Sequence, residues 1–108
     1  MAKAFDVRRT RVALRESRVE WQGHALERMA ARGIRRSDAL EVLLSGELIE
    51  EYSEDRPFPS ALFSGWVKTR PIHVVVALDA GRDRAFIITV YEPDLEHFEP
   101  DFKTRRRP

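Results

Sequence analysis

A histidine inside an apolar stretch is the first residue of this chain that suggests acid/base chemistry. His73 begins the run HVVVAL, whose β-branched residues predict a buried strand. A turn over residues 79–84 would place His73 across from Val90 or Tyr91 of the following strand. A neighbouring imidazole and phenol can exchange a proton, so His73 and Tyr91 are candidate catalytic residues. If their face of the sheet is covered, His73 is instead a buried, hydrogen-bonded core residue.

A second group of polar side chains shares one side of a predicted helix. At 100° per residue, His24, Arg28 and Arg32 lie within about 80° of arc. Guanidinium groups match phosphate oxygens with paired hydrogen bonds, so this row suits a nucleic-acid backbone. His24 and Arg28 are therefore candidate catalytic residues, and Arg32 is a candidate RNA-binding residue. The structural alternative is that Arg28 and Arg32 pair with Glu27, Asp38 or the acids of residues 47–55.

One reaction needs only these residue types. In metal-independent RNA cleavage, a base takes the proton of the ribose 2′-OH, which attacks the adjacent phosphorus, and an acid protonates the leaving oxygen. Cations stabilise the charge on the phosphoryl oxygens. Histidine and tyrosine supply the acid and the base here, and the basic C-terminal end supplies cations. Its candidate RNA-binding residues are Lys103, Arg105 and Arg106.

Metal and cofactor chemistry lack a motif in this chain. The sequence has no cysteine, and its histidines (His24, His73 and His97) fit no recognised short ligand spacing. It contains no phosphate-binding glycine loop and no serine nucleophile elbow. The acids Glu92, Asp94 and Asp101 are of the type that binds Mg²⁺, but no pattern singles them out. We therefore expect no metal and no cofactor.

Charge is unevenly distributed, although the formal net charge is only +1. Residues 1–36 have ten Lys or Arg against four Asp or Glu, whereas residues 37–67 have one against seven. Residues 102–108 have four basic residues and no acidic one. If the two basic ends meet in space, they form one positive patch that attracts a polyanion. If they do not meet, they are solvated surfaces.

Two helices joined by a tight turn are the best-specified elements. Apolar residues at i, i+3 and i+4 predict a helix over residues 24–32 and a second one after a cap at Ser37. Gly33 stands where a left-handed residue ends the first helix, and Gly46 ends the second. A further short helix is predicted over residues 5–18.

Four strands are predicted after these helices, over residues 47–53, 61–67, 72–78 and 85–91. The first is an edge strand, because its acids oppose edge-to-edge association. The predicted fold class is α+β, with two or three N-terminal helices packed on a four-stranded antiparallel sheet. Prolines interrupt the C-terminal segment, and its aromatic residues suggest that it docks on the sheet.

A chain of 108 residues fits a single domain, 1–108, with flexible ends at 1–9 and 104–108. Its apolar runs are far shorter than a membrane-spanning helix. The lack of cysteine agrees with a reducing compartment. We expect a soluble, cytoplasmic protein whose oligomeric state the sequence leaves open.

Five ordered blocks across residues 10–106 resemble the bacterial family called domain of unknown function 4258. The blocks are HALERMAARGI, SGELIEEY, RPFPSALFSGW, RPIHVVVALD and ITVYEPDLEHFEPDFKTRR. That family looks like a distant member of the RelE/ParE/BrnT-like toxin group, in which N-terminal helices pack on an antiparallel sheet. Active members of the group cleave mRNA without a metal, and such toxins are encoded beside antitoxins.

The resemblance implies a RelE-toxin-like fold and a toxin-like, metal-independent endoribonuclease. It implies RNA and an antitoxin protein as partners, and the short apolar runs predict no membrane contact. This hypothesis predicts a basic groove between helix 24–32, the sheet face and the tail. The alternative is a non-enzymatic module that binds a protein partner or nucleic acid, and a third possibility is a degenerate toxin fold with a structural role. A buried His73 favours these last two.

Overall fold

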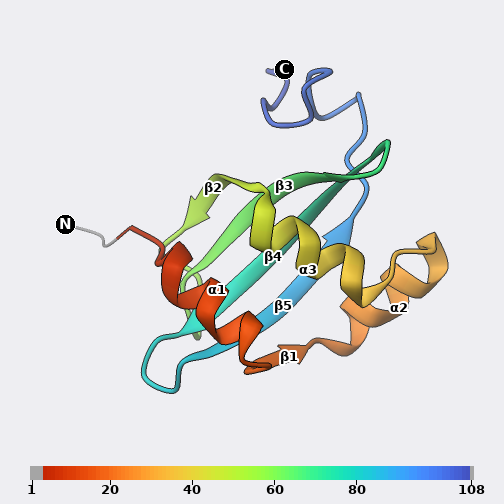
Figure 1. The fold of residues 1–108 in the computed structure, drawn as a ribbon. Helices are drawn as coiled ribbons and strands as arrows, with labels where there is room; N and C mark the ends of the chain where they lie inside the picture. The colour runs from red at the N-terminus through yellow and green to blue at the C-terminus, as the bar shows by residue number, and fades with distance from the viewer. Residues whose placement is uncertain (1–3, 108) are drawn as a thin grey trace.

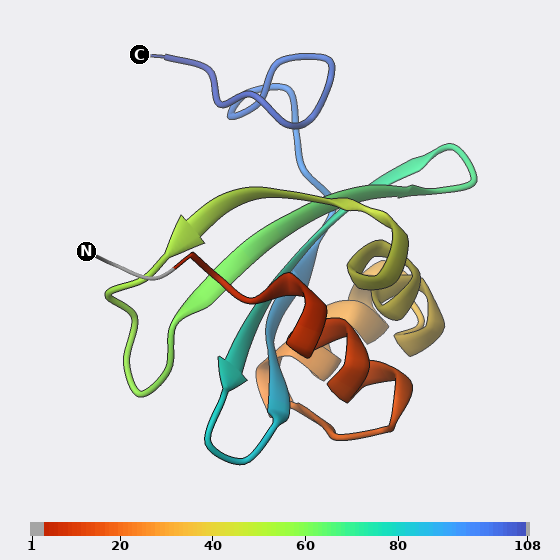
Figure 2. The ribbon, with the colours of Figure 1, turned by 60° about the vertical axis from the view of Figure 1, so that its left-hand side comes forward.

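Three helices lie on one face of a five-stranded sheet, and the C-terminal segment, residues 92–107, lies toward the other face (Figure 1 and Figure 2). The structure is a computed structural model, and it describes residues 4–107. In chain order the elements are α1 (Val7–Arg15), β1 (Val19–Trp21), α2 (Gly23–Arg32), α3 (Arg36–Ser45), β2 (Glu47–Tyr52), β3 (Ser60–Val67), β4 (Arg70–Asp79) and β5 (Arg84–Tyr91).

α2 begins and ends much as its sequence predicts, whereas α1 is shorter than the predicted helix over residues 5–18. Asp6 caps α1, because its carboxylate accepts a hydrogen bond of 2.9 Å from the backbone N–H of Arg9. At the end of α2, Gly33 has φ +65°, and the backbone N–H of Ile34 donates to the carbonyl of Met29 over 2.8 Å. This is the Schellman arrangement that a left-handed glycine allows. It turns the chain tightly into α3.

The N-terminus of α3 differs from the prediction. The helix begins at Arg36 and its cap is Arg35, not Ser37. Asp38, the third residue of the helix, accepts a hydrogen bond of 2.9 Å from the backbone N–H of Arg35. The acid therefore folds back onto the cap residue, and this half of a capping box makes a serine cap unnecessary.

The predicted sheet of four antiparallel strands is wrong by one strand. The four predicted strands do form the meander β2–β3–β4–β5, but the sheet is mixed and its order is β1-β5-β4-β3-β2. β1 adds to the free edge of β5 in parallel, with Val19 opposite Ala85 and Trp21 opposite Ile87. Three residues are too few to show strand periodicity, so only the open edge of β5 explains why they become a strand.

The two faces of the sheet have different coverings. Alternate residues of β4 point to the helices, and Ile72, Val74 and Val76 are fully buried there. The helices contribute Met29 and Leu43 among others to the same core. The opposite face of β4 carries His73, as the strand alternation predicts. None of the helices formed by residues 4–107 has the length and apolar character that a membrane span requires.

Candidate functional site

Polar side chains from four neighbouring strands meet on the sheet face opposite the helices. They are Glu50 and Tyr52 of β2, Ser64 of β3, His73 of β4 and Tyr91 of β5, and we call them the polar cluster. Ser64, His73 and Tyr91 are direct neighbours in the strand register. Glu50 and Tyr52 lie two residues apart on the edge strand, so they share a face.

His73 is at the centre of the polar cluster and is completely buried. Its Nε2 lies 2.6 Å from the carbonyl oxygen of Phe102, and its Nδ1 lies 3.1 Å from the hydroxyl of Tyr91. A carbonyl oxygen only accepts, so Nε2 carries the proton and Nδ1 accepts from Tyr91. The ring of Phe98 packs edge-on at 4.7 Å between centroids. His73 is therefore a neutral, fully hydrogen-bonded residue beneath the C-terminal segment.

The C-terminal segment is folded on itself where it covers the polar cluster. The backbone N–H of Glu99 donates to Thr104 over 2.8 Å, and that of Arg106 donates to His97 over 2.9 Å. Phe98 is only 2% exposed, which confirms that an aromatic residue of the segment docks on the sheet. Phe102 supplies the carbonyl oxygen, and the Ser64 hydroxyl also donates to that oxygen, over 3.2 Å.

The cations of the segment pair with carboxylates. Lys103 Nζ lies 3.1 Å from Glu47 Oε2. Arg105 makes a two-point ion pair with Glu50, with Nη2 3.2 Å from Oε1. Arg106 lies 3.0 Å from a carboxylate oxygen of Glu99 and also donates to a backbone carbonyl. The acidic strand predicted to pair with the helix arginines instead holds Lys103 and Arg105.

Burial and hydrogen bonding set the protonation of the polar cluster. Burial, with the hydrogen bond to Glu50, raises the pKa of Tyr52 to about 12. Burial also raises the pKa of Tyr91. Burial acts to raise the pKa of Glu50, but hydrogen bonds from Arg105 and Tyr52 outweigh it, and the net pKa is lowered. Burial lowers the pKa of His73. At neutral pH the cluster therefore contains one carboxylate, neutral hydroxyl donors and a neutral imidazole.

These protonation states give the cluster the parts of a metal-free acid/base site. Glu50 is a proton acceptor, and the Tyr52 hydroxyl donates to its Oε1 over 2.5 Å. Tyr91 keeps its proton at neutral pH because its pKa is raised, so it is a proton donor. Arg105 is a permanent cation, and the hydrogen bonds to Glu50 raise its pKa further.

Stability should fall when His73 is forced to take up a proton. The folded pKa lies below the value of about 6.5 of an unfolded histidine, so the unfolded chain binds the proton first. The His73 contribution is therefore complete above about pH 6.5 and is lost as the pH falls through the folded pKa, with a slope of up to about 1.4 kcal/mol per pH unit. Urea unfolding at pH 7, 6 and 5 measures it. His73→Gln should remove this slope and His24→Gln should keep it; equal slopes in all three proteins would contradict the assignment.

The structure divides the predicted site residues between two faces. His73 and Tyr91 lie together in the polar cluster, with Arg105 above them. His24, Arg28 and Arg32 are exposed on α2, which packs on the helix side of the sheet. The predicted groove between helix 24–32, the sheet face and the tail therefore does not form, because a strand layer separates α2 from the tail.

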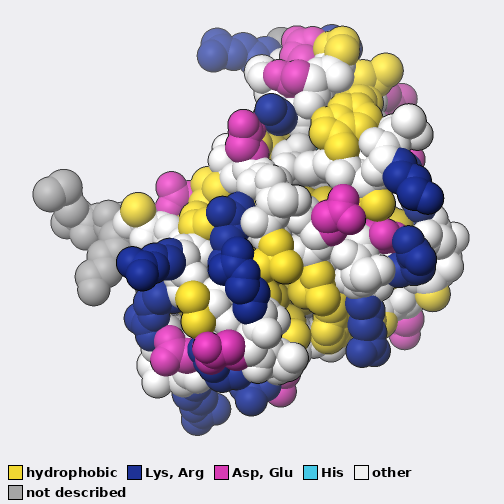
Figure 3. All heavy atoms as spheres, in the orientation of Figure 1, with side chains coloured by type: hydrophobic (Ala, Val, Ile, Leu, Met, Phe, Trp, Pro, Cys, Tyr) yellow, Lys and Arg dark blue, Asp and Glu magenta, His cyan; other side chains and the backbone are white. Residues whose placement is uncertain are grey.

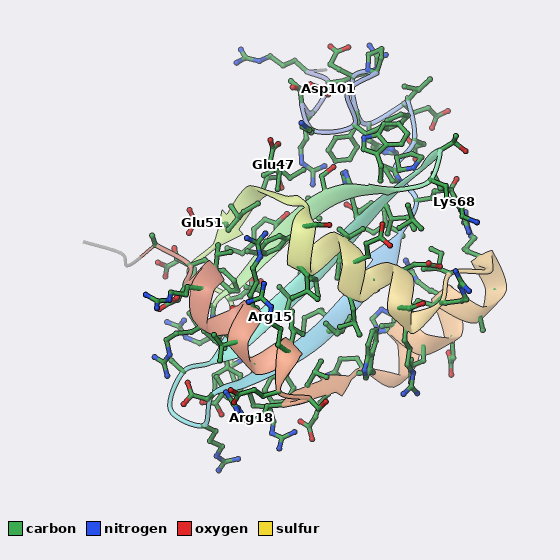
Figure 4. All side chains as sticks on the ribbon, viewed as in Figure 1. Arg15, Arg18, Glu47, Glu51, Lys68 and Asp101 are labelled. Carbon is green, nitrogen blue, oxygen red and sulfur yellow. The ribbon has the colours of Figure 1, made fainter. Side chains whose placement is uncertain are left out.

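The two basic ends of the chain also lie apart. Lys and Arg side chains gather over α1 on the helix side of the molecule (Figure 3). The N-terminal segment contacts β2 through Phe5, whose backbone N–H donates to Glu51, whereas the C-terminal segment reaches Glu47 at the start of the strand. Figure 4 shows these two acids directed toward the two different ends.

Three members of the polar cluster were missed from the sequence: Glu50, Tyr52 and Ser64. From the sequence, Glu50 is only one of the acids that protect a predicted edge strand. The available signal was its spacing from Tyr52, because residues two apart on a strand share a face. The same face of the sheet carries His73, but strand pairing is needed to learn that.

Exposed acids of the C-terminal segment make local contacts. Asp94, Glu96 and His97 have ligand atoms within 4.8 Å of one another. Asp94 already accepts from the backbone N–H of His97 and lies 2.8 Å from its ring Nδ1. Asp101 accepts hydrogen bonds from the backbone N–H groups of Lys103 and Thr104. These contacts account for Asp94 and Asp101 as turn-forming residues.

The comparisons with known proteins place the chain in a family. No curated protein and no solved structure matches it. The matching family model covers residues 21–92, which include all five members of the polar cluster and end where the C-terminal segment begins. Since this match spans two thirds of the 108 residues, the chain belongs to the family described as Domain of unknown function (DUF4258).

Proposed function

We propose that the chain is a toxin-like, metal-independent endoribonuclease with its site at the polar cluster. One observation carries the proposal: a carboxylate, an imidazole and two phenols converge on one sheet face, with the Arg105 guanidinium on the carboxylate. Helices on the opposite face of a largely antiparallel sheet agree with the RelE-like architecture that the sequence resemblance implies. Fold likeness does not transfer activity, so the proposal rests on the side chains.

The roles follow from the protonation states. Glu50 takes the proton from a ribose 2′-OH, and the 2′ oxygen forms a bond to the adjacent phosphorus. The bond from phosphorus to the 5′ oxygen breaks, and Tyr91 donates its proton to that leaving oxygen. The products are a 2′,3′-cyclic phosphate and a 5′-hydroxyl. Arg105 binds a backbone phosphate, and His73 Nδ1 holds the Tyr91 hydroxyl in place until its proton turns to the leaving oxygen.

A pocket on the same sheet face suits a flanking nucleotide. It has a volume of about 190 Å³ and lies beyond Tyr52 along the strands, where Ser60 and Ala77 form its floor. Phe58 and Phe86 stack on each other in its wall, with 5.6 Å between ring centroids. Aromatic surfaces bind unpaired bases by stacking, whatever the base. The pocket therefore supports a single-stranded substrate.

The test is cleavage of a mixed RNA by purified protein with EDTA present. Glu50→Gln should lower the cleavage rate by about 100-fold or more, the loss typical of a missing general base. Glu54→Gln, an exposed acid in the loop after β2, is the matched control and should cut like the wild type. Discrete products that end in a cyclic phosphate are expected. Wild-type rates from a folded Glu50→Gln variant would refute the site.

The burial of His73 favours a second candidate, a non-enzymatic module that binds nucleic acid or an antitoxin-like protein. Both ring nitrogens are satisfied, and Glu50 is neutralised by Arg105. Such a module would bind RNA with strong salt dependence and would leave it intact. Absence of cleavage by folded wild-type protein, with and without ribosomes, would select this candidate.

A further inference from the structure

The C-terminal segment places a backbone oxygen where two buried donors converge. His73 Nε2 and Ser64 Oγ both donate to the carbonyl oxygen of Phe102, over 2.6 and 3.2 Å. Ser64 is 3% exposed and His73 is fully buried. Neighbouring strands hold the two donors side by side, because Ser64 and His73 are paired in the register of β3 and β4. Without the segment, they would form a preorganised site for one oxygen atom.

Phe102 adopts an unfavourable backbone conformation to reach this position. Its φ is +55°, in the left-handed region that residues with a side chain rarely occupy. Its ring rests edge-on against Trp66, at 5.8 Å between centroids, and Trp66 remains 47% exposed. The ring of Phe102 is therefore held by a contact that solvent can reach on one side.

Two ion pairs with β2 help to fasten the segment, in addition to the docked ring of Phe98. Lys103 pairs with Glu47, and Arg105 pairs with Glu50. The four side chains are 25 to 62% exposed, so a polyanion in solution can compete for the two cations. Such an exchange replaces each carboxylate by a phosphate and leaves the carboxylates behind on the sheet. Arg105 leaving Glu50 would also free the proposed proton acceptor.

We propose that residues 92–107 form a displaceable cover over the polar cluster. In the closed form, the Phe102 carbonyl occupies a phosphoryl-oxygen site made by Ser64 and His73. Single-stranded RNA opens the cover by competing for Lys103 and Arg105. The proposal rests on the proposed function for the identity of the ligand. The cover explains how a buried histidine can be part of an RNA-binding site. The closed form is inactive, and RNA exposes His73 when it binds.

Trp66 provides a probe of opening that does not depend on cleavage. In a Trp21→Phe background, Trp66 is the remaining tryptophan. Loss of its Phe102 contact should change its fluorescence. The ligand is a 2′-O-methyl RNA oligonucleotide, which lacks the attacking hydroxyl and cannot be cut. We expect its binding, followed separately by anisotropy, to shift the Trp66 emission. Saturated binding with unchanged emission would overturn the cover.

Two charge reversals on β2 test the fastening. Glu47→Lys repels Lys103, whereas Glu51→Lys makes the same change of charge on the same strand but away from the cover (Figure 4). The oligonucleotide concentration that half-opens the cover should fall about 5-fold or more in Glu47→Lys relative to Glu51→Lys, as expected for replacing an exposed ion pair by repulsion. Equal values would overturn the role of the ion pair.

The two proposals fail separately. Opening of the cover by the oligonucleotide without any cleavage of ordinary RNA would support the cover and refute the nuclease. Cleavage of RNA with a silent Trp66 would support the nuclease and refute the cover.

Discussion

His73→Ala is expected to lower the free energy of unfolding by about 3–4 kcal/mol. The substitution removes a fully buried ring and leaves a cavity against Phe98. It also deprives the Phe102 carbonyl of its shortest hydrogen bond and Tyr91 of its acceptor. Urea unfolding at pH 7, where His73 is neutral, measures the loss.

His24→Ala is the matched control, because His24 is an exposed histidine on α2. It should change the free energy of unfolding by less than about 0.5 kcal/mol. A His73→Ala variant as stable as His24→Ala would mean that the ring is not held as described. The expected loss also changes how cleavage data are interpreted. A loss of cleavage in His73→Ala would reflect lost stability as much as lost chemistry, so Glu50→Gln is the cleaner test of chemistry.

The elements that the sequence predicts well are those with local signals. Gly33 ends α2 and Gly46 ends α3 because the turn chemistry lies within a few residues of each helix. The predicted cap of α3 at Ser37 is wrong because the helix begins at Arg36, and Asp38 folds back onto the backbone N–H of Arg35, which is the cap. Residues 19–21 look extended in the sequence, but their pairing as β1 could not be predicted, for a different reason. Its partner β5 lies more than sixty residues away, and three residues carry no periodicity.

The partner of His73 shows where sequence reasoning stops. The turn after β4 pairs Asp79 with Arg84, and an unbroken register would continue from there to pair His73 with Val90. The observed partner is Tyr91, because a bulge at Val75 and Val76 inserts one residue into β5. A bulge of one residue exchanges the two faces of a strand. The bulge therefore decides whether Tyr91 or Val90 faces the imidazole of His73.

The contacts that complete the candidate site are longer in range still. Glu50 and Arg105 are 55 residues apart and meet only because the C-terminal segment returns across the sheet. Composition predicts that acids and bases attract, but it does not select partners. The acids of β2 could have paired with the arginines of α2 or with those of the C-terminal segment. Because the sheet lies between α2 and that segment, they pair with the segment.

Gly46→Ala is the second large effect, because this glycine joins α3 to the strand that carries Glu50. An added Cβ would lie 2.5 Å from the carbonyl oxygens of Val42 and Ser64, one in the last turn of α3 and the other on β3. Both are backbone atoms, which cannot swing away as a side chain can. Relief requires β2 to move away from β3, or the helix end to open, at a cost of about 3 kcal/mol. Urea unfolding measures this cost.

Gly23→Ala is the control, since a Cβ at Gly23 meets nothing within 4 Å. It should be neutral or slightly stabilising, because alanine suits a helix better than glycine does. The position of Gly46 also ties this prediction to the site. Ser64, whose carbonyl the new methyl group would strike, donates its hydroxyl to Phe102, and Glu50 lies four residues along the displaced strand. Gly46→Ala should therefore loosen the cover as well as the fold, and the Trp66 emission should shift without ligand. Equal stability of the two glycine variants would show that β2 is not fixed at this junction. The packing of α3 against β3 would then not explain why Glu50 lies against Arg105.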